Sequence, residues 1–140
     1  PGTAGSALSL LFFPVLVALG LWGSIGLIVV ASIFGVWLCG AAADILKVHD
    51  HEAIVWDEFV GQWLTLLPLI PIAAWNLQTY SYLVLGFALF RLFDILKPWP
   101  ISWCDKHLEG GFGIMFDDVL AGIAAGGLLW LIINNGWFAF

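Results

Sequence analysis

The sequence predicts an all-α membrane protein, a single domain over residues 1–140 that forms a polytopic bundle of about five helices. Composition is the first indication: 62% of the residues are hydrophobic, 10% are charged and the mean hydropathy is +1.03, whereas soluble proteins contain about 25% charged residues. The second indication is the length of two charge-free segments, residues 1–43 and 59–90. Since a membrane-spanning helix needs about 20 residues, the chain has room for roughly five short crossings.

Each charge-free segment predicts a helical hairpin, because residues that interrupt helices lie near its middle. The first segment is broken near Gly20 and Gly23, and the second by Pro68, Pro71 and the polar residues 76–79. A last apolar stretch follows the acidic pair at 117 and 118. The expected helices, to within a few residues, span 7–20, 24–46, 54–70, 79–97 and 114–133.

The charged residues predict how the bundle is oriented in the membrane. All fourteen fall in three clusters, 44–58, 91–109 and the pair Asp117 and Asp118. If both hairpins return the chain to its starting side, these clusters share one face. The four basic residues then lie on that face: Lys47, Arg91, Lys97 and Lys106. The positive-inside rule makes that face cytoplasmic.

Charge and cysteine content exclude other classes of function. The formal net charge of -6 and the isoelectric point near 4.5 argue against a nucleic-acid partner, which would require basic surface. Cys39 and Cys104 are far apart and form no CxxC motif, so we expect inert thiols. Tryptophans at 56, 99 and 103 suit interfacial anchors, although simple aromatic packing is an equal alternative for each.

Five carboxylates form the main candidate site. Asp57 and Glu58 begin one expected helix, Asp94 lies near the end of another, and Asp117 and Asp118 begin a third. Two unit charges about 4 Å apart repel by about 4 kcal/mol at an effective dielectric constant near 20, so such a cluster requires cations. Oxygen ligands of this kind suit Mg²⁺ or Mn²⁺. The alternative is that each acid complements a helix dipole, worth about 0.3–1 kcal/mol; for Glu58 alone this alternative is competitive.

Basic residues beside the carboxylates indicate a phosphate ligand. Arg91, Asp94 and Lys97 recur every three residues and therefore share one helix face. An ordinary ladder of ion pairs is the alternative, worth only tenths of a kcal/mol. Arg91 is the only arginine in the chain, which favours the phosphate hypothesis.

Glycine-rich turns supply weaker candidates for anion binding. Gly111 belongs to a glycine-rich stretch, 110–113, ahead of the helix that carries Asp117, where backbone N–H groups are able to hold an anion. The opening PGTAGS offers a second such turn, in which Thr3 or Ser6 is otherwise an N-cap. His49 and His51 are potential metal ligands, but a solvated loop is the commoner role for such residues.

The motifs that are missing narrow the mechanism. Gly110, not an arginine, stands six residues after Cys104, and no DxDx[TV] motif or histidine-dependent lipid phosphatase set is present. Metal-assisted attack of water on phosphorus is therefore the favoured chemistry, in which the cation polarises a phosphoryl oxygen and stabilises the leaving alkoxide.

Three strings in the chain, VHDHEAIVWDEFVGQW, FRLFDILKPWPISWCDK and GGFGIMFDDVLAG, resemble the phosphatidylglycerophosphatase A family over nearly the whole length. The resemblance implies a magnesium-dependent enzyme of the bacterial inner membrane that converts phosphatidylglycerophosphate to phosphatidylglycerol and phosphate. It places the acidic motif residues of the family on the five carboxylates, with Arg91 and Lys97 in the same strings. Family members usually carry an N-terminal stretch that runs into PGT, whereas this chain begins at Pro1.

The resulting hypothesis is a cytoplasmic-facing site in which the five carboxylates hold one or two Mg²⁺. Arg91 and Lys97, with Gly111 and Thr3, would bind the phosphate while the lipid tails stay in the bilayer, and Asp57 or Asp118 would be the general base. Two alternatives stay open, a phosphatase of another lipid phosphate, such as a polyprenyl carrier, and a small ion or proton carrier. The sequence leaves the oligomeric state and an aspartyl-phosphate intermediate undecided.

Overall fold

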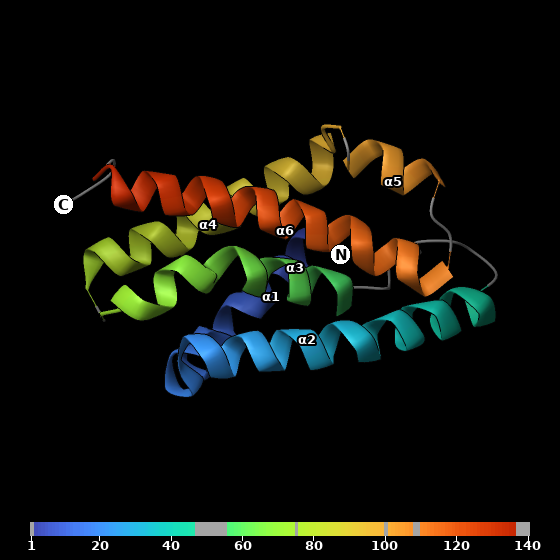
Figure 1. The fold of residues 1–140 in the computed structure, drawn as a ribbon, viewed down its shortest axis with the longest axis horizontal. Coiled ribbons are helices and arrows are strands. Elements are labelled where there is room, and N and C mark those ends of the chain that lie inside the picture. Colours follow the sequence, from blue (N-terminus) through green and yellow to red (C-terminus); the bar gives the residue numbers. More distant parts are fainter. Residues whose placement is uncertain (1, 47–55, 75, 100, 108–109, 137–140) are drawn as a thin grey trace.

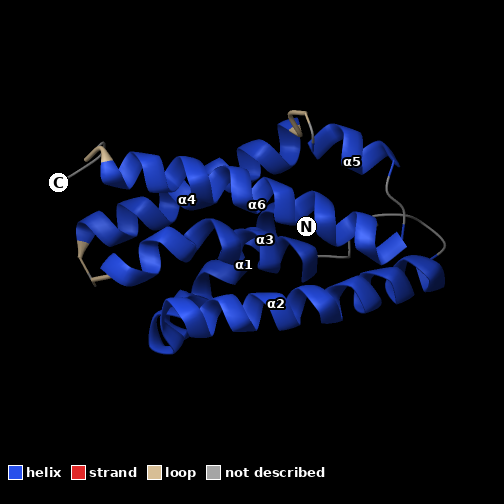
Figure 2. Ribbon diagram, viewed as in Figure 1, coloured by secondary structure: helices blue, strands red, loops and turns tan. Residues whose placement is uncertain are grey.

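The computed structural model describes residues 2–46, 56–74, 76–99, 101–107 and 110–136, and this part of the chain consists of helices joined by short turns, without strands (Figures 1 and 2). The predicted all-α fold is confirmed. The elements are α1 (Gly2–Ser9), the 3₁₀ helix η1 (Leu10–Phe12), α2 (Phe13–Leu46), α3 (Trp56–Leu66), the 3₁₀ helix η2 (Leu67–Ile72), α4 (Leu77–Leu96), α5 (Ile101–His107) and α6 (Gly110–Asn134).

The first predicted hairpin exists, and its turn is at Gly20. This residue has φ 75° and ψ 178°, a backbone conformation that glycine adopts without steric cost. The Ser24 hydroxyl donates a hydrogen bond of 2.8 Å to the Leu16 carbonyl, whereas eight residues of continuous helix would separate these groups by about 12 Å. The chain therefore reverses at Gly20, and the blue turn that leads into α2 lies at the lower left of Figure 1.

The second predicted hairpin also exists, with an α3 that is shorter than the expected helix 54–70. The chain tightens into η2 after Leu66 because Pro68 and Pro71 have no N–H to donate. α4 then begins behind Asn76, whose side-chain oxygen accepts a hydrogen bond of 3.0 Å from the Thr79 amide. This connection lies at the same end of the bundle as the Gly20 turn (Figure 1).

Three helical stretches are long and apolar enough to cross a membrane: Ala4–Leu38, which includes the Gly20 turn, Leu77–Leu96 and Met115–Asn134. They carry large apolar side chains outward, such as Trp22, Val84 and Ile33, as expected for surfaces that face lipid. α3 has only 11 residues, too few for a crossing by itself. It is instead enclosed by α1, α2, α4 and α6.

The connection between α4 and α6 contains a helix, α5, that lies outside the five expected helices. α5 covers Ile101–His107 and follows a turn in which the Ile101 amide donates to the Pro98 carbonyl at 2.8 Å. Ile101 and Cys104 are buried, and α5 packs on α6. α6 itself begins at Gly110 rather than near residue 114, so the glycine-rich residues 110–113 form its first turn.

α3 and α6 cross so closely that no side chain fits between their backbones. A Cβ atom on Gly122 would lie 2.5 Å from the Gly61 carbonyl oxygen, and one on Gly61 would lie 2.7 Å from the Asp118 carbonyl oxygen. The Thr65 hydroxyl donates hydrogen bonds to the carbonyls of Gly61 and Gly122, at 3.0 and 3.4 Å. Small residues permit such close packing in membranes, and here the crossing fixes where Asp118 lies beside α3.

Replacing Gly122 by alanine is expected to lower the free energy of unfolding by about 1–3 kcal/mol, the usual effect of overpacking. Gly127→Ala is the matched control, because a Cβ on Gly127 has nothing within 4 Å and alanine favours a helix by up to about 1 kcal/mol over glycine. Thermal unfolding in detergent measures both variants. Equal midpoints for the two would contradict the close crossing.

Candidate functional site

The five predicted carboxylates meet where the beginning of α3, the end of α4 and the first half of α6 come together. Two groups of three form there, each with ligand oxygens within 4.8 Å of one another: Asp57, Glu58 and Asp118, and Asp94, Asp117 and Asp118. Asp118 belongs to both groups, and the four aspartates are buried. We call these five residues the carboxylate cluster.

Helix dipoles do not account for the carboxylate cluster. Asp57 and Glu58 do lie in the first turn of α3, where negative charge is favoured. Asp117 and Asp118, however, come more than one turn after the start of α6, which has no acidic residue in its first turn. Asp94 lies near the C-terminal end of α4, where the dipole disfavours a negative charge. The charges of Asp94, Asp117 and Asp118 are thus not stabilised by the dipoles of their own helices.

Two basic side chains of α4 contact the carboxylate cluster. The Arg91 guanidinium forms an ion pair with Asp94 through Nη1. The Lys97 ammonium lies 2.7 Å from Asp117 Oδ2 and 3.7 Å from Asp94 Oδ1. The ladder of ion pairs along one helix, which was the simpler hypothesis for this stretch, is therefore present. Lys97 also forms an ion pair outside this ladder, because its bond to Asp117 joins the end of α4 to α6.

Lys97 adopts a backbone conformation that usually belongs to glycine. Its φ of 48° and ψ of 62° are left-handed, and its amide donates to the Phe93 carbonyl at 2.9 Å to end α4. A residue with a side chain costs roughly 1–2 kcal/mol in this conformation. The contacts of the ammonium group with Asp117 and Asp94 therefore explain why a lysine and not a glycine occupies this position. Burial alone would lower the pKa of Lys97, but the hydrogen bond to Asp117 and the negative charges of Asp117, Asp94 and Asp118 raise it above its ordinary value. The ammonium group therefore stays charged.

The described residues do not balance the charges of the carboxylate cluster. Five carboxylates face the two cations Arg91 and Lys97, which leaves three formal negative charges when all groups are ionised. The donor set consists only of carboxylate oxygens, and both groups of three offer ligands from more than one helix. This chemistry fits Mg²⁺ or Mn²⁺, which bind oxygen ligands and usually keep water or phosphate at their other coordination positions.

Packing of aromatic residues fixes the beginning of α3. The Trp56 indole N–H donates a hydrogen bond of 3.0 Å to the Ala31 carbonyl of α2. The same ring lies against Gly35, where a Cβ would be 2.7 Å from Trp56 Cδ1. Trp56 is thus half-buried between helices and holds Asp57 in place, whereas Trp99 and Trp103 are 80% and 50% exposed, which suits interfacial anchors.

Some predicted site residues do not join the carboxylate cluster. Gly111 lies in the first turn of α6, seven residues before Asp118 and therefore about 10 Å away along the helix axis. The glycines expected to precede the helix form its first turn instead, and the binding of phosphate by Gly111 stays a prediction. Thr3 lies in α1, but its side chain, like His49 and His51, falls outside the described residues.

Two buried polar groups lie near the carboxylate cluster: one belongs to Arg91, which the sequence predicted, and the other to Gln62, which it did not. Gln62 is fully buried one helical turn after Glu58, and neither end of its amide has a hydrogen-bond partner among the described residues. The same holds for Arg91 Nε. A glutamine inside the apolar stretch FVGQWLTL was the available signal for Gln62. Such buried donors and acceptors normally have partners, so both groups are suited to bind a polar ligand.

Comparison with known proteins agrees with this chemistry. The family model for phosphatidylglycerophosphatase A matches residues 1–133. Two proteins of that name are similar to the chain: one from Escherichia coli, 43% identical over 94% of this chain and 73% of its own length, and one from Haemophilus influenzae, 47% identical over 89% and 74%.

A third relative carries another name. A Bacteroides thetaiotaomicron protein named "Putative phosphatidylinositol-3-phosphatase" is 37% identical over 88% of this chain and 77% of its own length. No solved structure matches the chain significantly. The match over residues 1–133 and the identities above 40% show that the chain is an enzyme of the phosphatidylglycerophosphatase A family.

Proposed function

We propose that this protein hydrolyses phosphatidylglycerophosphate to phosphatidylglycerol and phosphate, as a magnesium-dependent step of phospholipid biosynthesis in a bacterial inner membrane. One observation carries the proposal: carboxylates from three helices converge on Asp118 beside Arg91 and Lys97, in a chain whose relatives are named for this activity. An ionic site next to apolar spans suits a substrate with a charged headgroup and lipid tails.

The two groups of three carboxylates would each hold one Mg²⁺, with Asp118 as the shared ligand. The bound ion would polarise the phosphoryl oxygen and acidify the attacking water. Asp118 belongs to both groups, so we assign the general base to Asp57, which would hold the ion through one carboxylate oxygen and accept the proton of that water through the other. The burial of Asp57 would keep bulk water away from the reacting groups.

Arg91 and Lys97 would bind the phosphate. Arg91 uses Nη1 for Asp94, so Nε and the remaining guanidinium donors are available for phosphate oxygens. Lys97 would orient Asp117 and Asp94 and also attract the anion. These cations and Lys106 lie toward the same end of the bundle as the carboxylate cluster, and the positive-inside rule would place this end in the cytoplasm.

Another lipid phosphate is the second candidate substrate. The Bacteroides relative, which is named for a phosphoinositide, supports it. The carboxylate cluster would bind the phosphate group, and it does not identify the residues that would contact the rest of the headgroup. Phosphate release from phosphatidylglycerophosphate, phosphatidylinositol 3-phosphate and a polyprenyl phosphate would separate these possibilities. A rate at least about a hundredfold higher for phosphatidylglycerophosphate, worth about 2.7 kcal/mol, is expected.

Replacing Asp118 by asparagine is expected to reduce phosphate release at least about a hundredfold, more than the loss of an outer-sphere partner usually costs. The metal-free protein should become more stable at the same time, because the substitution removes repulsion of about 4 kcal/mol per close pair of charges. Phosphate assays and thermal unfolding with chelator measure the two effects. Asp57→Asn and Asp94→Asn should also lose activity, and near-normal turnover in all three variants would rule out this site.

A chelator is expected to abolish activity, and Mg²⁺ to restore it. Added Mg²⁺ should also raise the unfolding temperature of the wild type, since saturation at about 100 times the dissociation constant stabilises a protein by about 2.7 kcal/mol. In Asp118→Asn this thermal shift should largely disappear, because both groups of ligands lose a member. Full activity in the presence of chelator would contradict the proposed chemistry.

Arg91→Lys is expected to lower kcat/KM by about tenfold or more, because charged hydrogen bonds contribute about 1.5–3 kcal/mol and lysine lacks the planar fork of donors. Lys97→Met should have an effect of similar size. The control is Lys106→Met, since Lys106 is exposed on α5 and should leave kcat/KM unchanged. Steady-state kinetics in mixed micelles measures all three, and equal effects at Lys97 and Lys106 would count against a phosphate role for Lys97.

A further inference from the structure

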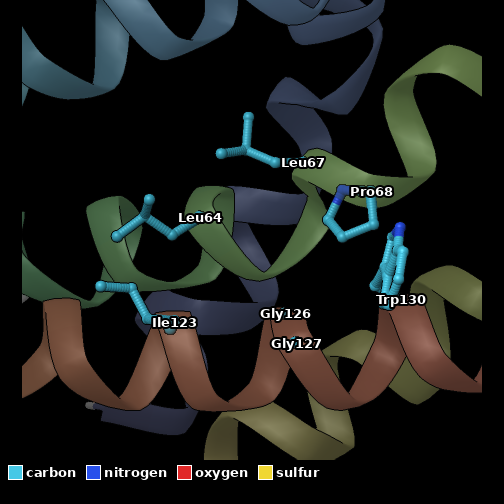
Figure 3. Close-up of a pocket in the computed structure, with 8 residues that line it drawn as sticks. Leu64, Leu67, Pro68, Ile123, Gly126, Gly127 and Trp130 are labelled. Carbon is cyan, nitrogen blue, oxygen red and sulfur yellow. The ribbon is translucent and has the colours of Figure 1, made fainter.

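A groove runs between α3, η2 and α6 on the outside of the bundle (Figure 3). It has a volume of about 260 Å³ and an apolar lining without any charged residue. Its walls are Leu64, Leu67, Pro68, Gly122, Ile123, Gly126, Gly127 and Trp130. Ile123 and Trp130 are 58% and 54% exposed, so the groove opens toward the surface that would face lipid.

The groove begins about one helical turn from the carboxylate cluster. On α3, Asp57, Gly61 and Leu64 follow each other at intervals of four and three residues, so they share one helix face, and Pro68 continues the groove wall in η2. On α6, Gly122 comes one turn after Asp118, and its Cβ position faces the Gly61 carbonyl. The faces that carry Asp57 and Asp118 thus continue into the groove walls.

Pro68 and Trp130 close the far end of the groove, and glycines line it along α6. Pro68 and Trp130 lie close to each other at that end (Figure 3), two helical turns beyond Gly122. Gly126 and Gly127 leave the α6 surface without side chains, and a Cβ on Gly127 would meet nothing within 4 Å. The groove is therefore a channel of about 12 Å along α6, open at the side and directed away from the charged end.

The lining of the groove suits a hydrocarbon chain and not a polar headgroup. The apolar lining offers no partner for a phosphate or a hydroxyl group. A second copy of the chain would also find Gly122 and Gly126 already in contact with the α3 backbone.

We propose that this groove holds one acyl chain of the lipid whose phosphate lies at the carboxylate cluster. The inference rests on the proposed function and adds to it a site that positions the substrate. Because lipid tails are as apolar as the groove, little hydrophobic energy is gained by the transfer. The groove acts through packing instead, and holds the glycerol end of the lipid at a fixed depth below Asp57 and Asp118. Misplacement by about 1 Å is enough to slow an enzyme up to about a hundredfold.

The test is to fill the groove without disturbing the fold. Gly127→Leu places a side chain in the channel from a position with no neighbour within 4 Å. Gly26→Leu is the matched control, because Gly26 lies on α2, outside the groove, and also has nothing within 4 Å. Both variants are assayed in detergent with Mg²⁺, on dioleoyl phosphatidylglycerophosphate and on its water-soluble dihexanoyl analogue, whose chains are too short to fill the channel.

Gly127→Leu is expected to lower kcat/KM for the dioleoyl substrate at least about fivefold relative to the dihexanoyl substrate, about 1 kcal/mol of positioning. Gly26→Leu should leave this ratio unchanged. Equal ratios in both variants and the wild type would overturn the acyl-chain site. A change of oligomeric state in Gly127→Leu, seen by native mass spectrometry, would also overturn it and assign the groove to a second copy. Failure of the wild type to hydrolyse either substrate would instead refute the proposed function.

Discussion

Mutual repulsion among five carboxylates is the constraint on which the rest of the structure depends. The oxygens of each group of three lie within 4.8 Å, and most of these side chains are shielded from water, where repulsion is only weakly screened. The surrounding helices offset this cost in two ways. Lys97 and Arg91 neutralise part of the charge from the α4 side, and the close crossing of α3 and α6 prevents the helices from separating. The result is a site whose remaining negative charge a bound cation would offset.

The same logic explains why polar and strained groups gather around the carboxylate cluster. Lys97 occupies a left-handed position that glycine would fill at lower cost, and Gln62 keeps an amide in the apolar interior. Elsewhere, the described core consists of ordinary apolar packing, as at Phe13, Leu66 and Leu129. Departures from the simplest choice of residue are thus concentrated where a ligand would bind, as is common for functional sites.

The sequence was sufficient for the features that local chemistry controls. Gly20 and the two prolines at 68 and 71 predicted the hairpins, and the placement of acids at segment boundaries predicted their convergence. It was insufficient where tertiary contacts decide. α5 is held by the packing of Ile101 and Cys104 on α6, not by a strong periodic pattern, and the glycines at 110–113 are helical despite their low propensity. The bond from Lys97 to Asp117 spans twenty residues, and no spacing rule within one helix reveals it.

The crossing at Gly61 and Gly122 has a consequence for ion selectivity. Because backbone contacts backbone there without side chains between, α3 and α6 cannot move closer, and the hydrogen bond from the Thr65 hydroxyl of α3 to the Gly122 carbonyl of α6 joins the two helices. The span between Asp57 and Asp118 is therefore set by main-chain geometry and not by adaptable side chains. Calcium needs oxygen distances of about 2.3–2.6 Å and magnesium only about 2.0–2.1 Å. If the carboxylate cluster holds an ion, a fixed spacing of these two backbones would favour the smaller one.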